Sequence, residues 1–220
     1  LGLYMDMDDV IAGDPQDESG NGNHGDARAG ASQNTAGFIN NSFSFGGTDD
    51  RIVFVDSATL NLLDSHERTI SLWFKASDTL SRSVLYEGGG VNNGFNIYLD
   101  ANTLYAGFWG SDVANTWLST PFFDTTSWHH VVLLFDGDSS EQSLYLDGVL
   151  VAHSSETGFV ASRSADVSIA SFVDRTHYHT GPQGSGGHGD YFTGDIDEVV
   201  ILNSALTPAQ ITNLRCIYLE

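Results

Sequence analysis

Residues 128–137 read W-H-H-V-V-L-L-F-D-G, and residues 144–148 read L-Y-L-D-G. Each stretch is an apolar run of strand length that ends at Asp-Gly, a strong turn signal. Asp147-Gly148 fits a tight hairpin between residues 144–146 and 149–151, because such turns favour residues that tolerate positive φ angles. This part of the chain therefore predicts neighbouring antiparallel strands.

Similar short strands recur along the chain. In residues 69–75, T-I-S-L-W-F-K, apolar side chains at 70, 72 and 74 share one face, since strand side chains alternate. Turn residues separate these runs, as in a β-sandwich. We expect strands at Leu3–Met7, Ser42–Phe45, Arg51–Val55, Ile70–Lys75, Val84–Tyr86, Phe95–Asp100, Leu104–Phe108, His129–Phe135, Ser143–Leu146, Val167–Ala170 and Glu198–Leu202.

One short helix is expected near the C-terminus. Thr207 is suited to cap it, and Pro208 is suited to its first position. The predicted core consists of Ile52, Phe54, Ile70, Leu72, Phe74, Ile97, Leu99, Val132, Leu134, Leu144, Leu146, Ile169, Val199 and Ile201.

Three more phrases complete a set in fixed order. They are D-E-S-G-N-G-N-H-G from Asp17, F-G-G-T-D-D-R-I-V-F from Phe45, and G-D-I-D-E-V-V-I-L-N-S-A-L-T from Gly194. With the first stretch they resemble the laminin-G-like and pentraxin-like branch of the concanavalin A-type jelly rolls, as found in large bacterial calcium-dependent (RTX-type) adhesins. The resemblance implies a jelly-roll sandwich of two antiparallel sheets, of about six or seven strands each, that binds ligands, often with calcium.

Composition limits the partners. The chain of 220 residues carries 29 acidic and 8 basic side chains, a formal net charge of −21. Nucleic-acid binding needs a basic footprint, and anionic membranes attract basic surfaces, so we expect neither partner. The acidity fits solubility in a salty or extracellular setting, or carboxylates that ligate cations. No apolar run is long enough for membrane insertion.

The chain shows no internal repeat and no linker, so we expect a single domain over residues 1–220. Cys216 is the only cysteine, which fits a bacterial secreted protein without disulfides. Leu219-Glu220 fits an expression-vector scar, which predicts a monomeric domain excised from a longer chain.

Calcium is the expected cofactor, because it binds carboxylate, amide and carbonyl oxygens. The first loop alternates oxygen-bearing side chains with glycines, and the resemblance implies that the strand after Gly194 lies beside it. The predicted metal ligands are Asp17, Asn21, Asn23, Asp195 and Asp197, with Asp49 and Asp50 as a second group and Asp174 and Asp190 as a third. Ordinary Asx turns explain the same residues without a metal.

A glycine-rich loop at 180–190 follows D-R-T-H-Y-H at 174–179. Long loops in compact domains often bind ligands, although a connecting loop is the simpler interpretation. The predicted ligand-binding residues are His177, Tyr178, His179 and His188 in this region, and Trp109, Asp112, Asn115 and Trp117 in W-G-S-D-V-A-N-T-W. The histidines also suit a transition metal, and the tryptophans also suit a core.

Catalysis has little support. The chain lacks the E-x-D-x-E arrangement of a glycosidase of this fold class, a G-x-S-x-G elbow, a P-loop and H-E-x-x-H. We expect no enzyme but a calcium-dependent module of a bacterial surface adhesin, located extracellularly at the cell surface, that binds a cell-surface glycan or peptide. A structural spacer and a carbohydrate-binding accessory module of a carbohydrate-active enzyme are the alternatives.

Overall fold

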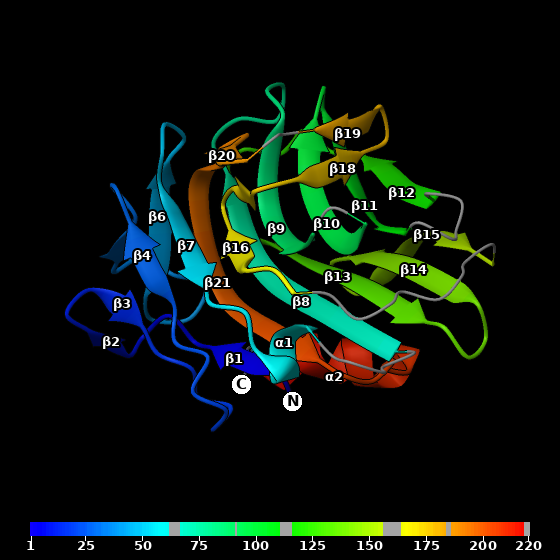
Figure 1. Ribbon diagram of the computed structural model, residues 1–220, viewed down its shortest axis with the longest axis horizontal. Coiled ribbons are helices and arrows are strands. Elements are labelled where there is room, and N and C mark those ends of the chain that lie inside the picture. Colours follow the sequence, from blue (N-terminus) through cyan, green and yellow to red (C-terminus); the bar gives the residue numbers. More distant parts are fainter. Residues whose placement is uncertain (62–66, 91, 111–115, 156–163, 184–185, 218–220) are drawn as a thin grey trace.

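The computed structural model describes residues 1–61, 67–90, 92–110, 116–155, 164–183 and 186–217. Within them, two large antiparallel sheets lie face to face, and Figure 1 shows both curving in the same direction. This is the predicted jelly-roll sandwich. The predicted Asp112 and Asn115 lie outside the described residues, as do Leu219 and Glu220.

The first sheet contains the strands that the opening phrases predict. Trp73 of one strand pairs with His130 of the next, and Leu133 pairs with Leu144 across the following hairpin. Its order is β15 (Val149–Ser154), β14 (Glu141–Leu146), β13 (His129–Asp136), β8 (Glu67–Ala76), β21 (Thr193–Leu202), β6 (Ser42–Gly46) and β5 (Ser32–Asn34), with β1 (Leu3–Met5) also on β21.

The second sheet lies in front in Figure 1. Tyr98 and Tyr105 are direct partners on two neighbouring strands near one edge of this sheet, and Tyr105 is also opposite Ser119. Its order is β12 (Thr116–Pro121), β11 (Thr103–Gly110), β10 (Asn93–Asp100), β9 (Ser83–Gly89), β16 (Val167–Ile169), β7 (Arg51–Phe54) and β4 (Asp26–Arg28).

The main apolar core fills the space between the two sheets, and most predicted core residues belong to it. Two expectations were wrong. Val132 and Leu134 point to the opposite face of β13, where they pack with Tyr145 and Ile211, while Val131, Leu133 and Phe135 fill the main core. The run V-V-L-L-F is apolar at every position because both faces of β13 are covered, so alternation cannot reveal which side faces inward.

The described residues form two helices, α1 (Ala58–Asn61) and α2 (Pro208–Ile217). The second is the predicted helix, and Thr207 and Gln210 form a reciprocal capping box at its start: the Gln210 amide donates to Thr207 Oγ1 and Gln210 Oε1 accepts from the Thr207 amide. Of these helices, neither has the length and apolar character needed to cross a bilayer.

Three two-stranded sheets complete the described part. They are β2 (Val10–Ile11) with β3 (Asp14–Pro15), β17 (Phe172–Val173) with β20 (His188–Gly189), and, between these last two strands in the chain, the hairpin of β18 (Thr176–Tyr178) and β19 (Gly181–Gln183). The β18–β19 hairpin belongs to the predicted histidine- and glycine-rich loop. It lies against the second sheet near β10 and β11 (Figure 1).

Candidate functional site: an aromatic face of the second sheet

The first loop does not present free metal ligands. Asp17 Oδ1 accepts hydrogen bonds from the Tyr4 and Ser19 amides, and Oδ2 accepts from Ser19 Oγ and the Asn23 amide, at 2.8–3.2 Å. Burial acts to raise the pKa of Asp17, but these hydrogen bonds outweigh it and lower the pKa. A carboxylate has about four acceptor positions, so this one is saturated.

The two asparagines of the same loop have structural contacts. The Asn21 amide donates to the Leu1 and Gly2 carbonyls, and the Asn23 amide donates to the Gly2 carbonyl and Thr59 Oγ1. The loop is therefore an Asx turn tied to the N-terminal strand. These contacts engage the side-chain nitrogens of Asn21 and Asn23, so in this loop it is the Asp17 carboxylate whose oxygens are already occupied.

The two late aspartates lie on β21. Asp195 accepts hydrogen bonds from Ser44 Oγ and the Asn34 amide, and the fully buried Asp197 accepts from the Ile39 and Glu198 amides at 3.1 and 2.9 Å. These donors differ from those that bind Asp17, so the first loop and β21 do not converge on one site. Glu198 is only 2% exposed, because a bulge in β21 turns it inward, where it accepts from the Tyr4 hydroxyl.

The remaining predicted metal ligands are dispersed. Asp50 accepts from the Gly30 and Gly46 amides, while Asp49 lies exposed in the turn beside it. Asp190 accepts from the Tyr178 hydroxyl, and Asp174 is exposed. Across the described ranges, no three His, Cys, Asp or Glu side chains gather closely enough to hold a metal.

The outer face of the second sheet is unusually aromatic. Alternation sends Phe95, Ile97 and Leu99 of β10 into the main core, so Tyr98 points outward. There it forms a separate cluster with Tyr178, against which Tyr105 and Trp117 pack. We call Tyr98, Tyr105, Trp117, Tyr178 and His179 the aromatic platform.

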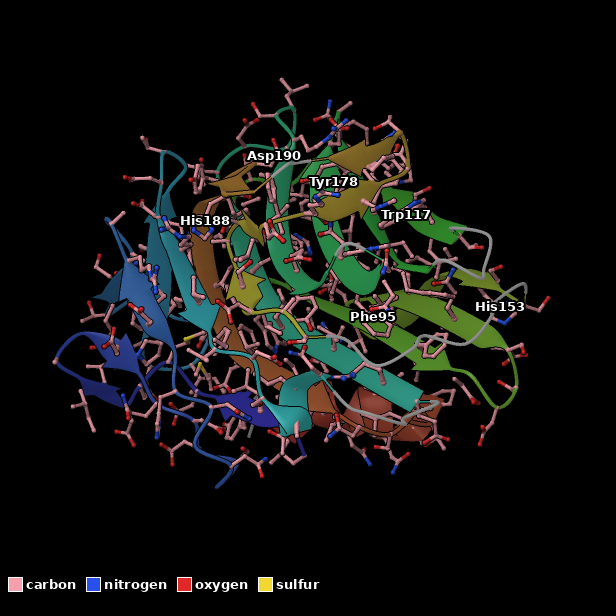
Figure 2. All side chains as sticks on the ribbon, in the orientation of Figure 1. Phe95, Trp117, His153, Tyr178, His188 and Asp190 are labelled. Atoms are coloured by element: carbon pink, nitrogen blue, oxygen red, sulfur yellow. The ribbon has the colours of Figure 1, made fainter. Side chains whose placement is uncertain are left out.

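Trp117 is half-buried on the edge strand β12. Its indole meets the Tyr98 ring edge-on at 5.5 Å and lies over Gly107, where an added Cβ would come within 3.0 Å of the indole. Glycine at 107 thus allows the indole to lie on the sheet. Figure 2 shows Trp117 and Tyr178 at the same end of the second sheet.

His179 is exposed and stacks on Tyr105, with ring centroids 4.1 Å apart and planes inclined by 6°. The Tyr98 hydroxyl accepts from the His179 amide and also lies 2.8 Å from His179 Nδ1. The Tyr98 hydroxyl thus engages Nδ1 and leaves Nε2 as the ring nitrogen that can face a ligand.

Buried polar contacts hold the hairpin on the sheet. The Asn96 amide donates to Thr176 Oγ1 and the His177 carbonyl, and the Tyr178 hydroxyl donates to Asp190 at 2.6 Å. The Arg82 guanidinium lies 4.5 Å from the centre of the Tyr178 ring. These contacts fix the position of His179 relative to Tyr105 and Trp117.

The prediction of a ligand-contacting Trp109 was wrong. Trp109 is 1% exposed, with His177 stacked on one face and the glycines of β9 and β10 beneath. A Cβ at Gly89 or Gly94 would lie 2.4 or 2.5 Å from the indole, so these glycines create its slot. His177 covers this tryptophan. His188 lies on β20, where it pairs with Val173 of β17, so neither histidine belongs to the platform.

The structure thus brings together three predicted residues, Trp117, Tyr178 and His179. Sequence reasoning missed Tyr98 and the role of Gly107. Alternation along 93–100 could have found Tyr98, because it predicts a large aromatic side chain on the face opposite Ile97 and Leu99.

Residues 46–212 match the Laminin_G_3 family, described as the concanavalin A-like lectin/glucanases superfamily. This match covers most of the chain, and the protein belongs to that superfamily. No curated protein matches the sequence.

Solved structures share the fold at low sequence identity. Domain 4 of AbnA, an extracellular GH43 arabinanase from Geobacillus stearothermophilus, in complex with arabinotriose, is 20% identical with a TM-score of 0.70, and 98% of each chain is covered. The binding domain of Paraclostridial Mosquitocidal Protein 1 is 15% identical with a TM-score of 0.76, covering 99% of this chain and 52% of that one. The binding domain of botulinum neurotoxin DC in complex with SialylT is 14% identical with a TM-score of 0.73 (98% and 50%). This chain spans about half the length of the toxin domains.

We predict that Trp109→Ala destabilises the domain by about 3–5 kcal/mol, because it leaves a large cavity under His177. Chemical denaturation measures the loss. A loss below about 1 kcal/mol would contradict the buried position.

A second prediction concerns the buried acids of β21. Burial raises the pKa of Asp197 from 3.8 to about 7, although amide hydrogen bonds oppose it, and burial and the Asp197 charge raise the pKa of Glu198 from 4.5 to about 8. The folded state then holds protons that the unfolded state releases. The stability that these two acids contribute is fully present below about pH 4, and it is lost as the pH rises toward 8.

Thermal melts in chelator and high salt, from pH 4 to 9, measure this slope. Asp197→Asn and Glu198→Gln should each flatten it, since neither replacement titrates. An unchanged slope in both variants would show that other groups cause the pH dependence.

Proposed function

We propose that this domain is a saccharide-binding module and that the aromatic platform is its binding surface. The observation that carries the proposal is the half-buried Trp117 beside the exposed His179, which stacks on Tyr105. Trp117 lies on strand β12, and His179 lies in the turn of the β18–β19 hairpin, which is held against the sheet by the contacts of the His179 amide and Nδ1 with the Tyr98 hydroxyl. Binding sites combine aromatic surfaces of this kind with a few fixed polar groups.

The chemistry of the platform suits a sugar ring. A pyranose or furanose presents a C–H face that packs on an indole or phenol, and it presents hydroxyls at its edge. His179 Nε2 supplies a hydrogen-bonding group for one hydroxyl, and the orientation of the ring is fixed because Tyr98 holds Nδ1. Ser119, exposed opposite Tyr105, adds a second polar group on the same face.

The similar folds support a binding role over catalysis. The AbnA domain was solved with arabinotriose, and the neurotoxin DC domain was solved with SialylT. A shared fold does not imply a shared ligand, so the proposal for this chain rests on its own aromatic platform. A non-enzymatic role is part of the same proposal.

The setting of the domain remains a prediction from the sequence. We propose an extracellular, bacterial surface protein, with an adhesin as the parent chain. An accessory module of a carbohydrate-active enzyme is the alternative, favoured by the full-length match to the arabinanase domain. A peptide-binding domain and a structural spacer also compete with the proposal, and a glycan-binding assay separates both from it.

The first functional prediction is that Trp117→Ala weakens glycan binding by at least about tenfold, since aromatic anchors at a contact centre contribute more than about 1 kcal/mol each. Glycan-array screening followed by calorimetric titration measures the change. Stability should fall far less than in Trp109→Ala, because Trp117 is half-buried.

The matched control is Phe123→Ala, which removes an aromatic side chain that is 68% exposed and lies just beyond β12. It should leave the affinity unchanged. Equal affinities of wild type and Trp117→Ala would place the ligand elsewhere.

Calcium dependence also remains a prediction, and Asp17→Ala tests its expected site. Because four protein donors saturate this carboxylate, we expect a loss of about 2 kcal/mol that is equal in calcium and in chelator. A loss of stability that is seen only when calcium is present would instead place the ion at Asp17, because a metal that binds the folded state stabilises it by mass action. Titration of chelator-stripped protein with calcium shows whether any site exists.

A further inference from the structure

Resting on the proposed saccharide function, we propose that the platform selects neutral glycans and rejects anionic ones, such as sialylated, sulfated or uronic-acid chains. The inference comes from the charges around the platform. Recognition of a sugar carboxylate or sulfate normally uses a cationic side chain with free donors, most often arginine.

Arg82 is the cation at the base of the platform, and it is paired with a carboxylate of the same sheet. Its Nε and Nη2 donate to Asp100 Oδ2 at 3.0 and 2.8 Å, and its Cζ lies 4.5 Å from the centre of the Tyr178 ring. Asp190 accepts from the Tyr178 hydroxyl on the other side of the hairpin. The carboxylates of Asp100 and Asp190 therefore both act on the charge of Arg82 at the base of the platform.

Most of the other described cations lie elsewhere. Arg28 and Arg51 are on β4 and β7, at the opposite edge of the second sheet. Arg68 and Lys75 are on β8 in the first sheet, and Arg215 is on α2. Arg163 lies outside the described residues.

Within the described part of the chain, Arg175 is the one exposed cation near the hairpin. It precedes β18 and is four residues from His179, which is about 13 Å along an extended strand. We therefore expect no salt bridge from Arg175 to a ligand on Trp117 and Tyr105.

The platform's own surface also disfavours anions. Aromatic ring faces carry partial negative charge, and His179 offers a single ring nitrogen, Nε2, beyond the one held by Tyr98. The formal net charge of −21 adds long-range repulsion of any anionic ligand, which salt screens over about 10 Å at 0.1 M.

The experiment uses an array of matched glycan pairs, each a neutral chain and the same chain with sialic acid, sulfate or a uronic acid. Binding is measured at pH 8 and at low and high ionic strength. We expect every bound chain to be neutral, with its acidic counterpart at least about tenfold weaker at low salt and a smaller difference at high salt.

Ser119→Arg provides the matched gain of function. It places a guanidinium opposite Tyr105 on the platform face, so it should strengthen binding of the acidic partner of each pair. Ser119→Gln, neutral and of similar length, should not. Arg175→Ala should leave both members of each pair unaffected.

The two proposals fail in different ways. Acidic chains that bind as tightly as their neutral partners, or more tightly, would overturn the charge selectivity while leaving the platform in place if Trp117→Ala still abolishes binding. Glycan binding that is unchanged in Trp117→Ala would place the ligand elsewhere and overturn the selectivity argued from the platform. No binding to any glycan would overturn the saccharide function and the selectivity with it.

Discussion

The apolar core between the two sheets constrains everything else in this domain. Every second side chain of the central strands is needed to fill it, among them Ile97, Leu99 and Leu133. A ligand therefore has no entry between the sheets. It must bind an outward face or a connecting loop, and those outward residues alternate in sequence with the core residues on the same strands.

The outward face of the second sheet is shaped by a layer laid across it. The β18–β19 hairpin contacts Asn96 and Tyr98, and Tyr98 is buried while Trp117 on β12 stays half-exposed. The Tyr98 hydroxyl contacts both the amide and Nδ1 of His179, so it ties the turn of the hairpin to the sheet and holds the His179 ring over Tyr105.

Membership of the concanavalin A-like superfamily fixes the architecture but not the ligand. What distinguishes this chain is its side chains: an aromatic face, a glycine at 107 that leaves room for the Trp117 indole, and an arginine, Arg82, paired with Asp100. The acidic loops, in contrast, use their carboxylates to satisfy backbone amides, as with Asp17 and Asp50.

The sequence alone determined the sandwich, the hairpin at Asp147-Gly148 and the capped helix at Thr207, because turn chemistry and alternation act over a few residues. It also named Trp117 and His179. Only the tertiary structure decided that Trp109 is buried while Trp117 is accessible, and that β13 uses Val131 and Leu133 for the main core. Those outcomes depend on which distant segment covers each face. The β18–β19 hairpin covers Trp109, and helix α2, which follows β21, covers the outer face of β13. No local sequence pattern contains this long-range packing, because the sequence around a tryptophan on a strand is the same whether or not another segment covers that side chain.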